Sequence, residues 1–203
     1  MKGVSDRREL GDLPGAAMSL GEGLGYFVEM VRGDWEAGEY ELRKGYDELV
    51  SMGDKNYVAI TSGWLAHCLY KLGRYREAEE HASISEEAAA KSWVAAQVVW
   101  RGVRARLLAR QEHVERAEAL AREAVDLALR TDRVDTQTDA LMSLAEVLIV
   151  SEHRAEAVPV VEDALRRYDS KEVVPAAARA RALIEELAPS VAAAVSVATP
   201  RLQ

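Results

Sequence analysis

Cysteine, proline and long apolar runs are scarce in this chain of 203 residues. Its single cysteine, Cys68, excludes an internal disulfide and a cysteine-based zinc finger. No run reaches the ~20 apolar residues of a membrane span. The opening MKGVSDRRELGD also lacks the apolar core of a signal peptide, so we expect a cytoplasmic protein with no membrane partner. Lys and Arg number 26 against 34 Asp and Glu, and the net charge of −8 argues against direct nucleic-acid binding.

No proline occurs between Pro14 and Pro159, so nearly all of this stretch can be helical. A proline inside a helix costs ~3 kcal/mol. Apolar residues in the stretch recur at spacings of three and four, which is the period of an amphipathic helix. One such stripe comprises Trp64, Leu65, Cys68, Leu69 and Leu72. The pattern predicts an all-α protein.

Four segments repeat the same small-residue positions along the chain. They are GDWEAGEYELRKGYDEL, GRYREAEEHASISEEAA, EHVERAEALAREAVDLA and EHRAEAVPVVEDALRRY. Each has a small residue five positions after its opening turn residue, at Gly38, Ala78, Ala117 and Ala157, so the intervals are 40, 39 and 40 residues. The helices before them keep the register, with Gly23, Gly63, Gly102 and Met142 at equivalent sites. We interpret each unit as a helical hairpin whose small residues let its two backbones approach, and which must stack on its neighbours.

The second unit resembles a tetratricopeptide repeat. Its Trp64-Leu65-Ala66, followed by Leu69, Gly73, Tyr75 and Ala78, matches the small and large positions of that family. The period here exceeds the family's usual length of about 34 residues, which implies longer helices. The third and fourth units carry Glu112 and Glu152 where the family has a turn glycine.

Over residues 24–187 the chain is also similar to the C-terminal helical repeat region of bacterial multidomain signalling regulators. In those proteins a class III nucleotide cyclase or a helix-turn-helix regulator is joined to a P-loop ATPase. The resemblance lies in GDWEAGEYELRKGYDEL, GRYREAEEHASISEEAA, VVWRGVRARLLAR, AREAVDLALRTD, TDALMSLAEVL and AAARARALIEEL. It implies a role in signalling or transcription control. No GxxxxGK[ST] phosphate loop occurs, so we expect either a separate relative of that region or a piece of a longer protein.

These patterns predict a right-handed superhelix, an α-solenoid, of about four tetratricopeptide-like helix pairs with a C-terminal capping helix. The repeat domain is expected over 17–190. Its units are expected at about 19–56, 57–94, 95–135 and 136–172, with the final helix at 174–190. Residues 1–16 are expected to form a flexible lead and 191–203 a fraying tail.

Patterns that would indicate catalysis or a cofactor are weak. The GEGLG run at 21–25 lacks the preceding strand and the βαβ unit of a dinucleotide site, and Gly23 fits the repeat register. The four histidines form no HExxH motif, and Cys68 lies in an apolar stripe. We therefore predict no enzyme activity, no cofactor and no metal site.

The segment 92–111 forms a basic region in this acidic chain, since it holds four arginines and no acidic residue. By repeat register, Arg106 and Arg110 point toward the groove, while Arg101 and Arg104 point toward the packing side. Two interpretations stay open. The arginines form a structural ion-pair network between units, or they bind an anion or an acidic peptide through bidentate contacts.

The function expected from these features is that of a non-catalytic interaction module in bacterial signalling or transcription regulation. It would bind a protein or peptide partner, or another domain of a larger signalling protein, in the concave groove. The groove residues we predict are Phe27, His67, Tyr70, Lys71, Arg106, Arg110, Met142, Glu146 and Ile149. One alternative is a small-molecule or peptide sensor with an arginine-lined anion site. Another is a homo-oligomerisation module in which the apolar segment 191–198 pairs two copies.

Overall fold

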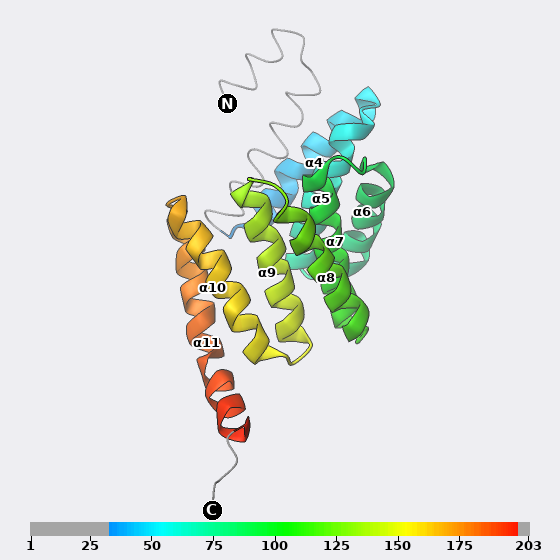
Figure 1. The fold of residues 1–203 in the computed structure, drawn as a ribbon. Coiled ribbons are helices and arrows are strands. Elements are labelled where there is room, and N and C mark those ends of the chain that lie inside the picture. Colours follow the sequence, from blue (N-terminus) through cyan, green and yellow to red (C-terminus); the bar gives the residue numbers. More distant parts are fainter. Residues whose placement is uncertain (1–32, 199–203) are drawn as a thin grey trace, which may run out of the picture.

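The computed structural model describes residues 33–198, with side chains to residue 189, and these residues form eight α-helices and no strand (Figure 1). The predicted all-α class is thereby confirmed. The expected lead at 1–16, the expected first helix of the first unit and the last residues of the tail lie outside the described residues.

The described helices follow one another in pairs joined by short turns. The first described helix is α4 (Trp35–Met52). Three hairpins come next: α5 (Lys55–Lys71) with α6 (Tyr75–Ala88), α7 (Val94–Arg110) with α8 (Val114–Ala128), and α9 (Val134–Val150) with α10 (Arg154–Ser170). These hairpins begin within two residues of the unit boundaries expected at 57, 95 and 136. The last helix, α11 (Val174–Ala198), continues past the boundary expected at 190 and includes Pro189.

In the second and third described hairpins, the first helix packs against both helices of the preceding hairpin. α5 contacts α7, and α7 contacts α9, while each second helix contacts the first helix of its own unit and that of the next. No comparable contact joins α6 to α8 or α8 to α10. Figure 1 shows the hairpins side by side, with α10 and α11 at the end of the stack away from α6. The first helices therefore form one continuous layer.

Glycines at the repeat positions allow this close approach. A Cβ atom at Gly63 of α5 would lie 2.8 Å from Val99 Cγ1 of α7 and 3.0 Å from Ser85 Oγ of α6. A Cβ atom at Gly102 of α7 would lie 2.6 Å from Ser143 Oγ of α9. The sequence analysis placed this contact within one hairpin. The structure shows that it mostly joins first helices of consecutive units, because that is where the backbones come closest.

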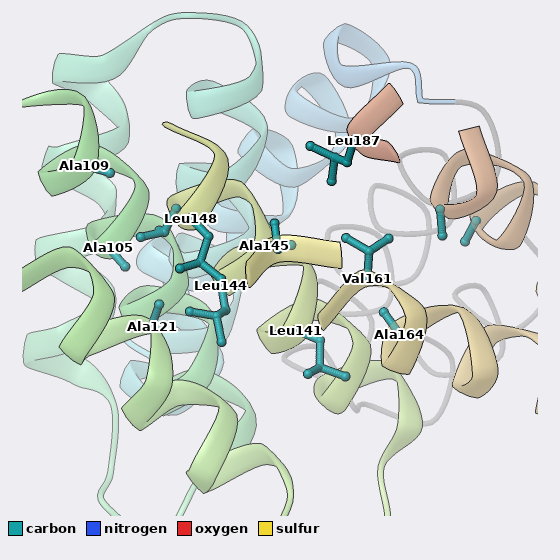
Figure 2. Close-up of a cluster of buried hydrophobic side chains, with 14 of the residues drawn as sticks. Ala105, Ala109, Ala121, Leu141, Leu144, Ala145, Leu148, Val161, Ala164 and Leu187 are labelled. Carbon is teal, nitrogen blue, oxygen red and sulfur yellow. The ribbon is translucent and has the colours of Figure 1, made fainter. Parts of the chain in front are cut away.

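Alanine-lined surfaces receive the larger side chains of the neighbouring helices. In Figure 2, Leu144 and Leu148 of α9 lie near Ala105 of α7 and Ala121 of α8, and Val161 of α10 lies on the other side of α9. These residues are all buried. Alanine loses no side-chain conformational entropy on burial and its side chain is small, so the helices can approach closely. Each leucine that packs against this surface buries apolar area that contributes roughly 2 kcal/mol to stability.

The turn inside each hairpin depends on one residue with a positive φ. In the three described hairpins this residue is Gly73, Glu112 or Glu152, with φ of 75°, 62° and 63°. The amide of the next residue then donates to a carbonyl in the last turn of the first helix, as His113 does to Leu108 at 3.0 Å. The turn thus keeps its shape in the two units that lack glycine.

We predict that Gly63→Ala destabilises the fold by about 1–2 kcal/mol, because overpacking outweighs the ~1 kcal/mol gain in helix propensity. Val99 is β-branched and stiff at χ1, so it cannot easily move from the new methyl group. The measurement is urea unfolding followed by circular dichroism. The double variant Gly63→Ala/Val99→Ala should cost less than the sum of the two single changes. Additive losses would show that this contact does not set the helix spacing.

Glu112→Gly should raise the free energy of unfolding by about 1 kcal/mol, because a left-handed backbone is costly for any residue with a Cβ atom. The matched control is Glu115→Gly in the first turn of α8, where the backbone is helical and glycine should lower stability. Thermal and urea unfolding of both variants measure the difference. A loss of stability in both variants would mean that Glu112 is not strained.

Candidate functional site

A cavity of about 320 Å³ lies where the first helices of three hairpins meet. Residues of α5, α7 and α9 line it, together with Trp35 of α4 and residues of α10 and α11. Its apolar wall consists of Trp35, Met142, Ile149 and Leu183. Its polar lining consists of His67, Lys71, Arg106, Asp139, Glu146, Tyr168 and Arg179. The volume lies at the lower end of the ~300–1,000 Å³ range of small-ligand cavities.

Glu146 joins three consecutive units at the centre of this cavity. Its Oε2 atom lies 2.6 Å from Nζ of Lys71 on α5 and 2.9 Å from Nε of Arg106 on α7. The Arg106 side chain is only 3% exposed, whereas the side chains of Lys71 and Glu146 are about a quarter exposed. A single carboxylate oxygen therefore neutralises part of the charge of two cations from different hairpins.

The charges in this group fix the protonation states around it. Burial raises the pKa of Glu146, but the nearby Arg106 and Lys71 outweigh this and hold the pKa below its usual 4.5. Burial, and then the Glu146 charge, raise the pKa of Tyr70 to about 12. Burial, with Arg106 and Lys71, lowers the pKa of His67 well below 6.5. At neutral pH, Glu146 is charged and both rings are neutral.

Aromatic rings form one side of the cavity. The ring of Trp35 stacks on that of His67, with centroids 5.7 Å apart and an interplanar angle of 18°. The Trp64 ring lies 6.0 Å from His67, and Nζ of Lys71 lies 5.9 Å from the Trp35 ring centroid. A neutral imidazole suits this stack, since its ring can lie flat against the indole without bringing a third positive charge beside Arg106 and Lys71.

Six of the predicted groove residues line the cavity: His67, Lys71, Arg106, Met142, Glu146 and Ile149. Two others lie beside it. Tyr70 is buried next to the cavity, with the Arg106 guanidinium 5.8 Å from its ring. Arg110 is exposed and lies over the ring of Tyr75 at 4.3 Å. Phe27 lies outside the described residues.

The other two arginines of α7 form ion pairs with second helices. Arg101 pairs with Glu123 of α8 at 3.0 Å and lies 4.1 Å from the Trp100 ring. Arg104 pairs with Glu79 and Glu86 of α6, at 3.2 and 2.7 Å, and donates a hydrogen bond to Ser83. Both guanidinium groups point away from the cavity, toward the neighbouring acidic side chains of the hairpins.

The sequence analysis did not include several lining residues: Trp35, Asp139, Tyr168, Arg179 and Leu183. It assigned the groove to the first helices alone. One signal was present, because Asp139, Met142 and Glu146 are spaced three and four residues apart and therefore share a face of α9. Arg179 and Leu183 of α11 are likewise four apart. Their contribution depends on how the last helix packs against α10.

No protein-family model matches the chain, and no curated protein matches it either. Within residues 33–198, no group of three or more His, Cys, Asp or Glu side chains is arranged to hold a metal ion. None of the described helices combines the length and the apolar character needed to cross a bilayer.

We predict that Glu146→Gln lowers the free energy of unfolding by about 1–3 kcal/mol at pH 7, because Arg106 then loses the carboxylate paired with its buried charge. The pKa of Glu146 is lower in the folded state than its unfolded value of 4.5. Its contribution to the free energy of unfolding is therefore complete above pH 4.5 and is lost as the pH falls through the folded-state pKa. The difference between wild type and variant should therefore shrink below about pH 4.5. Urea unfolding from pH 7 to pH 4 measures it.

The control is Glu123→Gln, which removes a half-exposed partner of Arg101 and should cost less than about 1 kcal/mol. Equal losses in the two variants, or a difference that stays constant with pH, would contradict a stabilising role of the Glu146 charge.

Proposed function

We propose that this chain is a non-catalytic interaction module that binds a segment of a partner protein along its inner face. In this proposal the helix pairs form a right-handed, tetratricopeptide-like superhelix, and the inner face is its concave groove. The setting would be bacterial signalling or transcription control, as the sequence resemblance implies. The partner would be a separate protein or another domain of a larger signalling protein.

The packing pattern supports a curved stack. The first helices contact one another from unit to unit, whereas α6, α8 and α10 have no comparable contacts among themselves. A layer whose members lie closer together than those of the other layer takes the inner side of a bend. This spacing supports a concave surface formed by α5, α7 and α9.

The observation that carries the proposal is the cavity shared by three successive units. Its polar groups are largely held in place by Glu146 and by the stacked rings of Trp35 and His67. Binding to a preformed surface spares most of the cost of ordering side chains. Apolar walls beside charged groups suit a segment that combines an apolar anchor with polar neighbours.

A small-molecule sensor is the second candidate, and the dimensions of the cavity favour it. About 320 Å³ is enough for one large side chain or for one small metabolite. The two functions differ in what extends beyond the cavity, because a segment would continue along α5, α7 and α9, whereas a metabolite would not.

The test is selection of binders from a random peptide library displayed on phage, with the whole chain as bait. Selected peptides are then synthesised, and Kd is measured by isothermal titration calorimetry. Met142→Lys, which fills the cavity with a longer charged side chain, should weaken binding by about tenfold or more. Leu129→Lys at the exposed end of α8 should leave Kd unchanged.

Peptides that bind equally well to Met142→Lys would place the interaction on another surface and contradict the proposal. A folded Met142→Lys variant, checked by circular dichroism, is needed for the comparison. If no peptide is selected but a metabolite raises the melting temperature of the wild type and not of Met142→Lys, the sensor replaces the interaction module.

A further inference from the structure

Arg106 is the most deeply buried charged residue of the cavity wall. It projects from α7, between the side chains of α5 and α9, and is 3% exposed. Its closest charged partner is Glu146, and the ring of Tyr70 lies 5.8 Å from its guanidinium carbon. A guanidinium at this depth has lost most of its contact with water, so its hydrogen-bonding groups need acceptors within the protein or in a ligand.

The donors of Arg106 find no acceptor among the described residues. Its Nε atom lies 2.9 Å from Glu146, but the N–H bond is not directed at the oxygen, so the contact is an ion pair without a hydrogen bond. The two terminal nitrogens form no hydrogen bond with a described residue. By contrast, terminal nitrogens of Arg101 and Arg104 on the same helix donate to Gln97 and Ser83.

The described residues of the lining carry slightly more positive than negative charge. Lys71, Arg106 and Arg179 are cationic, Asp139 and Glu146 are anionic, and His67 is neutral at pH 7. The formal charges of these described residues sum to +1, in a chain whose net charge is −8. A planar guanidinium with free parallel donors matches the two oxygens of a carboxylate or phosphate, which it binds in a bidentate manner.

We propose that Arg106 binds a carboxylate of the ligand through its terminal nitrogens, and that this carboxylate belongs to an Asp or Glu side chain of the partner segment. This inference rests on the proposed function, because it assigns the anchor of the segment bound in the cavity. The apolar residues Met142 and Leu183 lie on the same cavity wall and would receive the neighbouring side chain of the segment. Glu146 keeps its contacts with Nζ of Lys71 and Nε of Arg106, so the carboxylate of the ligand does not need to displace Glu146.

The first experiment uses free anions, which act independently of any peptide. Sodium glutarate is titrated into the whole chain at constant ionic strength, with sodium chloride as the matched salt, and the melting temperature is recorded. Glutarate should raise the melting temperature of the wild type above the chloride value. Arg106→Lys, which keeps the charge but loses the planar pair of donors, should weaken the apparent affinity by about tenfold. The side chain of Arg76 on α6 is 90% exposed, so the Arg76→Lys variant should respond to glutarate as the wild type does.

The second experiment assigns the source of the carboxylate. In a peptide selected with the wild type, each Asp and Glu is replaced in turn by Asn or Gln, and Kd is measured with wild type and with Arg106→Lys. One replacement should cost about tenfold with the wild type and much less with Arg106→Lys, since the two changes remove the same contact. Such coupling is not expected if Arg106 merely stabilises the fold.

Three results would overturn the inference: a glutarate response equal to that of chloride, an Arg106→Lys variant that responds as the wild type, or peptides whose acidic residues are all uncoupled from Arg106. In the last case, peptides that remain sensitive to Met142→Lys would leave the proposed function intact. If glutarate binds through Arg106 while no peptide binds in the cavity, the proposed function fails and the anion belongs to a free small molecule.

Discussion

Direct contact between the first helices of consecutive hairpins is the constraint on which the other features depend. α5 and α7 can approach only because Gly63 leaves no side chain between them, and Gly102 does the same for α7 and α9. A hairpin alone cannot bury its apolar stripe, so the stack supplies most of the core. The same contact brings side chains of units that are about 40 residues apart in sequence within reach of one another. The cavity and its ion pairs follow from that approach.

The ion pairs in the cavity lining depend on this close approach of consecutive units. Lys71, Arg106 and Glu146 come from three different hairpins, and in an unfolded chain nothing would hold them together. Removing them from water is costly, and a buried pair of this kind adds little net stability compared with well-packed apolar residues. Its effect lies in orientation, since Glu146 fixes the position of both cations at the cavity wall. The outer pairs of Arg101 and Arg104 join first and second helices in the same way but face away from the cavity.

Much of this architecture could be predicted from residue spacing. The turn residues that the repeats single out, Gly73, Glu112 and Glu152, each have a positive φ at the turn of a described hairpin. Because helical register follows from sequence position, residues of α5, α7 and α9 that line the cavity could also be expected to lie together. The pairing of Lys71 with Glu146 could not be predicted, since residues 75 positions apart in the sequence meet only through the stacking of units. The contribution of α11 was missed for the same reason, as Arg179 and Leu183 belong to no repeat unit.

The pairing of Glu146 changes how the basic residues of the groove act. The sequence suggested that Lys71, Arg106 and Arg110 together attract an acidic segment. In the structure the first two share a carboxylate, and Arg110 lies outside the cavity over Tyr75. Long-range attraction by the described lining residues is therefore weak, because their formal charges sum to only +1 within an acidic molecule. Selectivity would then arise at short range, from the direction of hydrogen-bond donors rather than from charge. A guanidinium held rigidly between a carboxylate and an aromatic ring meets that requirement, whereas a flexible lysine at the same place would not.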